Sequence, residues 1–196
     1  MGKIVVSENV SLDGVVQDPT GDEGFRRGGW FGQFGGRDLE EWGKLEFEES
    51  LRAEALLLGR RTDAWFAERW LSRDGEWADR LNNMPKYVVS ATIDEPRWAT
   101  SKNSAVLRGD VASEVSALKQ AVAGEILVFG SAPLVHALME HDLVDEVRLT
   151  VYPVVLGDGE RLFAETTGKR PMRLVRARTI GENLAHLSYE RAGQAG

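Results

Sequence analysis

The sequence contains no cysteine, and this absence excludes disulfides, thiolate metal sites and cysteine nucleophiles. Histidine is also scarce: His136, His141 and His186 show no metal-ligand spacing with one another, so we predict no metal site. No apolar run approaches the roughly 20 residues that span a bilayer, and residues 1–20 lack the apolar segment of a signal peptide. We therefore expect a cytoplasmic protein with no membrane partner.

Positive charge is limited as well, with 24 lysines and arginines against 31 aspartates and glutamates and a net charge of −7. This balance argues against a nucleic-acid partner. The GxGxxG, P-loop and GxSxG motifs are all missing. Their absence leaves an ordinary Rossmann site, the simplest kinase or NTPase, and an esterase unsupported. The 196 residues fit one ordinary domain, residues 1–196.

The order of the predicted elements indicates a three-layer α/β/α domain. The predicted strands cover 3–7, 55–58, 86–91, 105–107, 126–129, 144–155, 172–180 and 184–190, of which the last two form a closing hairpin. The predicted helices cover 38–51, a stretch after residue 62, 111–122 and 133–139, with Asp38 and Asp110 as N-caps. Residues 72–85 are interpreted as a connecting segment. The pattern is typical of a mainly parallel central sheet with antiparallel C-terminal strands.

Residues 126–139 combine a short apolar strand with an immediate turn into a helix. The strand leads into Gly130, Ser131 suits an N-cap, and Pro133 suits the first helical turn. The N-terminus of such a helix carries unpaired N–H groups, which bind anions such as phosphate. A plain turn without a ligand is the alternative interpretation of this stretch.

The same arrangement occurs at residues 55–62, where a strand ends on glycine and is followed by two arginines and a threonine. Arginine binds phosphate in a bidentate geometry, although two surface arginines would give the same pattern. Ser90 and Thr92 supply hydroxyls after a third strand. Ligands bind outside the carboxyl ends of the strands in such sheets. The three strand ends together favour a dinucleotide with an extra phosphate near the arginines.

Residues 21–36 contain seven glycines interleaved with Phe25, Trp30, Phe31 and Phe34. This density of glycine fits neither a helix nor a strand. The segment is either a lid that closes over a flat ligand or a loop whose aromatic side chains cover part of the core.

Five motifs, in this order and spacing, resemble those of the dihydrofolate reductase superfamily. They are SLDG (11–14), LLLGRRT (56–62), VVSAT (88–92), ILVFGSAPL (126–134) and LVDEVRLTVYPVVLGDGERLF (143–163). The chain resembles the bacterial branch that is similar to the C-terminal reductase domain of riboflavin-biosynthesis deaminase/reductase proteins. This resemblance extends from Lys3 to Arg191 and implies a dihydrofolate-reductase-like fold.

The resemblance implies an NADPH-dependent reductase that transfers hydride to a C=N or C=O bond of a small heterocyclic substrate of pteridine or pyrimidine type. Asp13 is the implied catalytic residue, at the nicotinamide end of the site, and a homodimer is the implied assembly. The implied cofactor-binding residues are Gly14 beside Asp13; Gly59, Arg60, Arg61 and Thr62 at the 2′-phosphate and pyrophosphate; Ser90 and Ala91 at the ribose; and Gly130, Ser131 and Ala132 at the pyrophosphate.

Two departures from the family pattern concern the substrate. Dihydrofolate reductases carry a pterin-binding acid on the helix after the loop; its place falls near Gly43 here, and Glu41 and Glu46 are the nearest acids. Riboflavin-pathway reductases carry an acid shortly after the threonine of the second motif, where this chain has Phe66. Two alternatives therefore stay open: the 5-amino-6-(5-phosphoribosylamino)uracil reductase of riboflavin biosynthesis, and a module that binds NADPH or another flat ligand without turnover.

Overall fold

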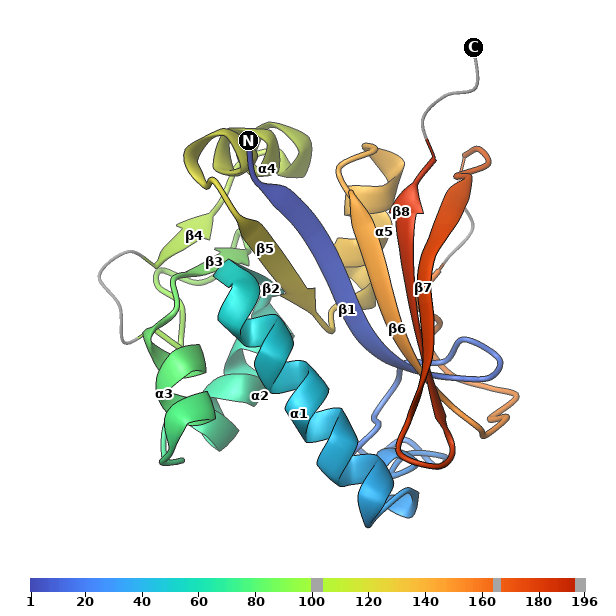
Figure 1. Cartoon of the computed structure of the whole chain (residues 1–196). Helices are drawn as coiled ribbons and strands as arrows, with labels where there is room; N and C mark the ends of the chain where they lie inside the picture. The colour runs from blue at the N-terminus through green and yellow to red at the C-terminus, as the bar shows by residue number, and fades with distance from the viewer. Residues whose placement is uncertain (100–103, 164–166, 193–196) are drawn as a thin grey trace.

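The computed structural model describes residues 1–99, 104–163 and 167–192, and an eight-stranded sheet forms its centre (Figure 1). The strand order is β4-β3-β2-β5-β1-β6-β8-β7. The strands are β1 (Lys3–Ser11), β2 (Ala53–Gly59), β3 (Lys86–Val89), β4 (Ala105–Leu107), β5 (Glu125–Phe129), β6 (Glu146–Tyr152), β7 (Met172–Ile180) and β8 (Leu184–Arg191). All neighbours from β4 to β6 are parallel, whereas β8 is antiparallel to both β6 and β7. The predicted fold class is confirmed.

Helices cover both faces of the sheet and complete the three layers. They are α1 (Arg37–Arg52), α2 (Arg60–Trp70), α3 (Glu76–Asn83), α4 (Val111–Ala121) and α5 (Ala132–Glu140), with a short 3-10 helix at Phe31–Gln33. Alternate residues of β1 separate the two cores: Ile4 and Val6 pack toward α4 and α5, and Val5 packs toward α2 and α3. In Figure 1, α1 crosses in front of the sheet and α5 lies behind it. No helix in the described ranges has the length and apolar character of a membrane span.

The prediction of a connecting segment at 72–85 is wrong, because this region contains α3. Eight residues are too few to display a helical period clearly, and the helix forms through tertiary contacts instead. Ala78 and Leu81 are buried against α2 and β2. The Lys86 ammonium donates hydrogen bonds to the carbonyls of Leu81 (2.5 Å) and Asn82 (2.7 Å) at the end of the helix. Cations that bind the last carbonyls of a helix stabilise its C-terminus, and Lys86 does so for α3.

The two predicted N-caps have different outcomes. Asp110 is confirmed, because its carboxylate accepts a hydrogen bond of 3.0 Å from the Ser113 amide. Asp38 is wrong as a cap, because α1 begins at Arg37 and Gly36 occupies the cap position. The buried Asp38 carboxylate instead accepts hydrogen bonds from the backbone amides of Glu182 (2.6 Å) and Asn183 (3.0 Å). Asp38 therefore fixes the turn between β7 and β8 against α1.

Buried side chains anchor the glycine-rich segment (residues 21–36) to the core. Trp30 is fully buried, its indole nitrogen donates to the Gln17 carbonyl at 3.1 Å, and its ring packs edge-on against Tyr152 at 5.3 Å. The Asp18 carboxylate accepts hydrogen bonds from the amides of Glu23 (3.1 Å) and Phe25 (3.0 Å). Part of this segment therefore belongs to the core.

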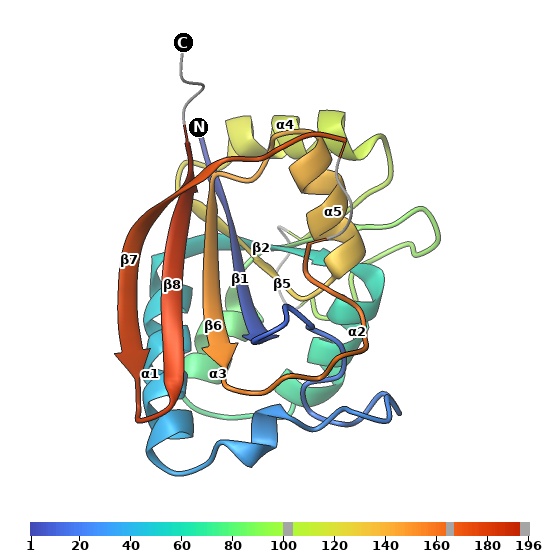
Figure 2. The same cartoon turned by 90° about the vertical axis from the view of Figure 1, so that its right-hand side faces the viewer.

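The C-terminal hairpin forms one edge of the sheet, where β6, β8 and β7 lie side by side (Figure 2). The edge strand β7 is exposed from Arg173 to Thr179, and Leu174 and Val175 are each 50% exposed. An exposed edge strand can pair with another chain. The homodimer expected from the sequence stays a prediction.

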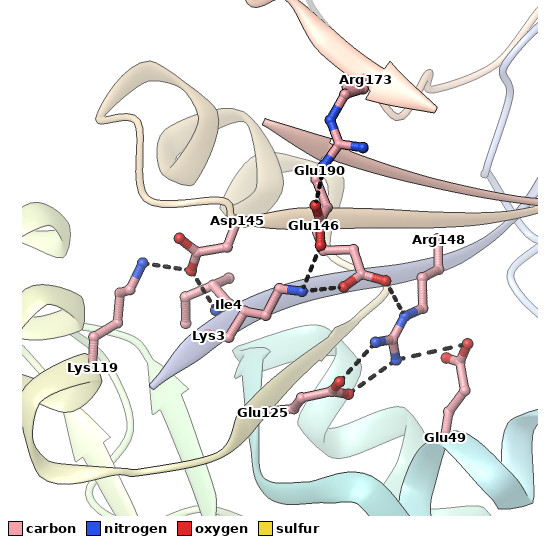
Figure 3. A network of polar contacts seen from close by, with 10 residues as sticks. All are labelled: Lys3, Ile4, Glu49, Lys119, Glu125, Asp145, Glu146, Arg148, Arg173 and Glu190. Atoms are coloured by element: carbon pink, nitrogen blue, oxygen red, sulfur yellow. Dashed lines mark hydrogen bonds and ion pairs between the residues drawn. The ribbon is translucent and has the colours of Figure 1, made fainter. Parts of the chain in front are cut away.

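A network of charged side chains joins the amino ends of the central strands (Figure 3). Arg148 on β6, which is buried, binds both carboxylate oxygens of Glu125 (2.8 and 3.0 Å) and one of Glu146 (2.6 Å), and Glu49 of α1 lies 3.8 Å away. Lys3 binds Glu146 from the other side at 2.6 Å. A buried guanidinium surrounded by carboxylates ties β1, β5, β6 and α1 together, since each charge depends on its partners to offset desolvation.

Replacing Arg148 by alanine is expected to lower the free energy of unfolding by about 3–5 kcal/mol, because the mutation leaves buried carboxylates unpaired. Urea denaturation measures the change. The matched control is Arg173→Ala, which removes an exposed guanidinium bound to Glu190 at 2.8 Å and should cost at most about 1 kcal/mol. Equal losses in the two variants would contradict the proposed role of the buried network.

Candidate functional site

A cavity of about 930 Å³ lies at the carboxyl ends of β1, β2 and β5. This volume is near the upper end of the range for small-molecule sites, roughly 300–1,000 Å³. The cavity exists because the central strands differ in length. Strand β5 ends at Phe129, opposite Ser7, whereas β1 continues to Ser11 beside β6. The chain leaves β5 through Gly130 and opens a space that α1, α2 and α5 surround.

The two predicted strand-to-helix turns meet at this cavity. A Cβ atom on Gly59 would lie 2.1 Å from the Ser131 hydroxyl oxygen, and one on Gly130 would lie 3.2 Å from a Thr62 side-chain carbon. The N-termini of α2 and α5 are therefore neighbours, and both present their positive ends to the same space. Gly59, Arg60, Arg61, Thr62, Gly130, Ser131 and Ala132 all line the cavity.

Ser131 occupies the N-cap position of α5, but its side chain makes no capping hydrogen bond. The backbone is left-handed at both Gly130 (φ 58°) and Ser131 (φ 61°). Two successive left-handed residues turn the chain so sharply that the hydroxyl points toward the glycine end of β2 instead of the first turn of its own helix. The predicted N-cap position of Ser131 is confirmed, but the hydroxyl does not cap the helix.

Arg60 and Arg61 begin α2 at the mouth of the cavity and are both exposed. Within the described residues, neither guanidinium forms a hydrogen bond or an ion pair with another side chain. Two unpaired cations beside paired helix N-termini make this end of the cavity attractive to a polyanion.

Four other predicted residues lie outside the lining of this cavity: Asp13, Gly14, Ser90 and Ala91. Ser90 follows β3, the strand next to β2, and its hydroxyl accepts a hydrogen bond from the Thr92 amide at 3.1 Å. The binding roles of these residues stay predictions.

Asp13 acts in the structure as a clamp between two loops. Its carboxylate accepts hydrogen bonds from the amides of Leu156 (3.0 Å) and Gly157 (2.8 Å) and from the Ser11 hydroxyl (2.8 Å). These donors, with Leu156 first, lower the pKa of Asp13 to about 2. Its assignment as the catalytic residue stays a prediction, while its observed contacts hold the SLDG turn against residues 156–157.

Aromatic side chains, several of which pack against one another, form an aromatic wall of the cavity. They come from the glycine-rich segment, α1, α2, α3 and β5, and comprise Phe31, Trp42, Trp65, Phe66, Trp70, Trp77 and Phe129. The Trp42 indole donates to Asn9 at 2.9 Å. The indole nitrogens of Trp65 and Trp77 are buried without a hydrogen-bond partner among the described residues. Unpaired buried donors are costly, so this wall suits a flat ligand that carries hydrogen-bond acceptors.

Two of the carboxyl groups that line the cavity have raised pKa values, Glu8 on β1 and Glu46 on α1. Burial raises the pKa of Glu8 to about 8, and a Gly130 backbone hydrogen bond acts in the opposite direction. Burial also raises the pKa of Glu46 well above its usual range. The negative charges of Glu49 and Glu8 raise this pKa further. Both acids are therefore candidates to hold a proton at neutral pH.

The sequence indicated Glu46 only as one of the two acids nearest a family position, and it did not indicate Glu8. The predicted first strand stopped at residue 7, whereas β1 continues through Glu8 to Ser11. A glutamate inside a central strand runs against strand preference and against burial. This conflict was the one sequence feature that could have indicated a functional role for Glu8.

Among the described residues, no group of three or more histidine, aspartate or glutamate side chains is arranged to hold a metal ion.

The fold and the cavity define a dihydrofolate-reductase-like α/β domain. The chain belongs to the RibD C-terminal domain family, whose model matches residues 2–186. The uncharacterized protein YyaP of Bacillus subtilis (strain 168) is 30% identical over 142 residues, which cover 69% of this chain and 73% of YyaP. The uncharacterized protein YwjB of the same organism is 41% identical over 75 residues, or 38% of this chain and 42% of YwjB.

Solved structures show the same fold at low sequence identity. A candidate riboflavin biosynthesis protein of Shewanella sp. PV-4 has a TM-score of 0.76 and 20% identity, covering 97% of this chain and 99% of that one. A Thermotoga maritima deaminase/5-amino-6-(5-phosphoribosylamino)uracil reductase has a TM-score of 0.64 and 14% identity; 97% of this chain matches 57% of that protein. Enterococcus faecalis dihydrofolate reductase, solved with NADP(H) and RAB-propyl, has a TM-score of 0.57 and 16% identity, covering 97% of each chain.

Replacing Gly59 by alanine is expected to separate the two helix N-termini. The backbone at Gly59 (φ −81°, ψ 159°) suits alanine, but a Cβ atom would lie 2.1 Å from the Ser131 hydroxyl and 3.0 Å from its Cβ. We expect a loss of about 1–3 kcal/mol in the free energy of unfolding, measured by urea denaturation. The control is Gly35→Ala, where no heavy atom lies within 4 Å of the added carbon. A neutral Gly59→Ala variant would contradict the close approach.

Proposed function

We propose that this protein is an NADPH-dependent reductase that transfers hydride to a C=N or C=O bond of a small, flat heterocycle. The observation that supports the proposal most directly is the meeting of the α2 and α5 N-termini beside two exposed arginines that have no partner among the described residues. A pyrophosphate fits two converging helix N-termini. An additional phosphate fits two guanidinium groups. A nicotinamide dinucleotide that carries a 2′-phosphate combines both features.

The two ends of the cavity suit different ligands: the end at Arg60 and Arg61 suits the phosphates of the cofactor, and the end at the aromatic wall suits flat rings. The exposed arginines favour an outward position for the phosphorylated adenosine, which directs the nicotinamide toward the interior. The bound nicotinamide would supply the hydride. The residues of the chain orient the two ligands, exclude water with the tryptophans, and provide partly buried carboxyl groups that can hold a proton.

Replacing Arg60 and Arg61 by alanine should weaken NADPH binding far more than NADH binding. Each charged hydrogen bond lost to the 2′-phosphate is worth about 1.5–3 kcal/mol, and NADH lacks that phosphate. Quenching of tryptophan fluorescence measures both affinities. Arg178→Ala, on the exposed strand β7, is the control and should change neither affinity. Equal losses for NADPH and NADH in the double variant would show that these arginines do not bind the 2′-phosphate.

The second candidate is the riboflavin-pathway uracil reductase, favoured by the family and by the fold of the Thermotoga maritima enzyme. Its substrate carries its own phosphate. The cavity lining combines the aromatic wall with Glu8 and Glu46, whereas its cations are exposed: Arg60 and Arg61 at the start of α2, and Arg73 just after α2. The inner end therefore fits an unphosphorylated heterocycle better than a ribosyl phosphate. The third candidate, a binding module without turnover, shares the cofactor site.

A substrate panel separates these candidates. NADPH oxidation is followed with dihydrofolate, dihydropterins and 5-amino-6-(5-phosphoribosylamino)uracil. We expect turnover with an unphosphorylated heterocycle and little with the ribosyl phosphate. Preference for the ribosyl phosphate would establish the riboflavin-pathway reaction instead. Tight NADPH binding with a flat response across the panel would favour the binding module.

A further inference from the structure

Glu8 is the first residue of β1 beyond the end of β5. Pairing between β1 and β5 stops at Ser7, opposite Phe129, whereas pairing with β6 continues. From Glu8 onward, one edge of β1 therefore borders the cavity at the point where Gly130 turns the chain toward α5. The Glu8 carboxyl group interacts with the Gly130 backbone, and its charge acts on Glu46 of α1. Glu8 thus lies between the turn at Gly130 and the carboxyl group of Glu46.

One oxygen of this carboxyl group, Oε1, is enclosed and has no hydrogen-bond partner in the described part of the chain. Burial raises the pKa of Glu8 to about 8, so the group carries a proton at neutral pH. A neutral acid with an unused oxygen beside a cavity can donate a hydrogen bond, and then its proton, to a bound ligand.

The cations that line the cavity are all exposed. Arg60 and Arg61 begin α2, and Arg73 follows its end. The carboxyl groups that line the cavity besides Glu8 are Glu46 of α1, Glu68 of α2, and Asp18, Glu23 and Glu160 of the loops. Strand β5 and helix α5 contribute no charged side chain to its described lining. A buried cation beside Glu8 would favour its ionised form. The described lining contains no such cation, so Glu8 keeps its proton.

We propose that Glu8 is the proton donor of the reductase reaction and lies against the reactive ring of the dinucleotide, an inference that rests on the proposed function. Hydride adds to the carbon of the acceptor C=N or C=O bond, and the π electron pair moves to the nitrogen or oxygen. That atom takes the proton of Glu8. The products are the reduced substrate, the oxidised cofactor and a Glu8 carboxylate, so atoms and electrons balance. The new carboxylate and the new positive charge on the ring form together and attract each other.

This arrangement makes cofactor binding depend on the charge state of Glu8, even without substrate. NADP⁺ carries a positive ring and should lower the pKa of Glu8, whereas NADPH carries a neutral ring and should leave the proton in place. By linkage, NADP⁺ must bind more tightly as the pH rises toward the free-protein pKa of about 8 and then level off. NADPH affinity should lack this increase.

The experiment is to measure the dissociation constants of NADP⁺ and NADPH by tryptophan fluorescence from about pH 6 to about pH 9.5, on both sides of the Glu8 pKa. Both cofactors carry the same 2′-phosphate, which titrates near pH 6, so its contribution cancels in the ratio of the two constants. The ratio Kd(NADP⁺)/Kd(NADPH) should fall with rising pH by about tenfold for each unit by which NADP⁺ lowers the pKa. Glu8→Gln should abolish this fall.

The matched control is Glu68→Gln, which removes an exposed carboxylate from the rim of the same cavity and should keep the wild-type pH dependence. A second measurement needs no variant. Calorimetry of the wild-type protein near pH 7.5, in two buffers of different ionisation enthalpy, should show proton release on binding NADP⁺ but not on binding NADPH.

A pH-independent ratio, or the same slope in Glu8→Gln as in wild type, would overturn the role of Glu8. Equal proton counts for the two cofactors would overturn it as well, even if Glu8→Gln does not fold. Each of these results leaves the reductase proposal standing, because both cofactors still bind. Failure of the wild-type protein to bind either cofactor would instead overturn the proposed function, and the inference with it.

Discussion

The site depends on one close approach, between the glycine that ends β2 and the serine that begins α5. Ser131 reaches within 2.1 Å of the space that a Cβ atom on Gly59 would occupy. This contact brings two helix N-termini together in front of adjacent parallel strands. Because β5 stops while β1 continues, the same geometry opens the cavity and exposes the edge of β1 at Glu8. The anion-binding end and the inner end of the cavity therefore follow from one packing constraint.

Among the described residues, charged side chains are paired with one another at the amino ends of the central strands, but some at the carboxyl ends lack such partners. At the amino ends, Arg148 is surrounded by carboxylates, and the charges offset one another (Figure 3). At the carboxyl ends, Arg60 and Arg61 lack partners in the described structure, and Glu8 keeps an unused oxygen. The ion pairs around Arg148 stabilise the fold without a ligand, whereas unpaired groups that line a cavity can gain partners when a ligand binds. This contrast favours a function at the carboxyl ends.

The sequence predicted most of the fold because local patterns specify its regular elements. The apolar runs at 55–58 and 126–129 became buried central strands, and the turn at 181–183 joined the closing hairpin. The missed element, α3, is short and depends on Lys86 and on packing against α2. Asp38 had the composition of a cap, but a turn distant in sequence supplied better donors for its carboxylate.

The sequence by itself determined which residues could bind an anion: glycines at strand ends, followed by hydroxyls or arginines, carry that preference wherever they fold. Only the tertiary structure decided that the turns at Gly59 and Gly130 face the same space, because their contact joins residues far apart in the chain. It also separated Asp13, which clamps two loops, from Glu8, which borders the cavity. A carboxyl group's role depends on its desolvation and on the donors that surround it, and both are set by neighbours that the local sequence does not specify.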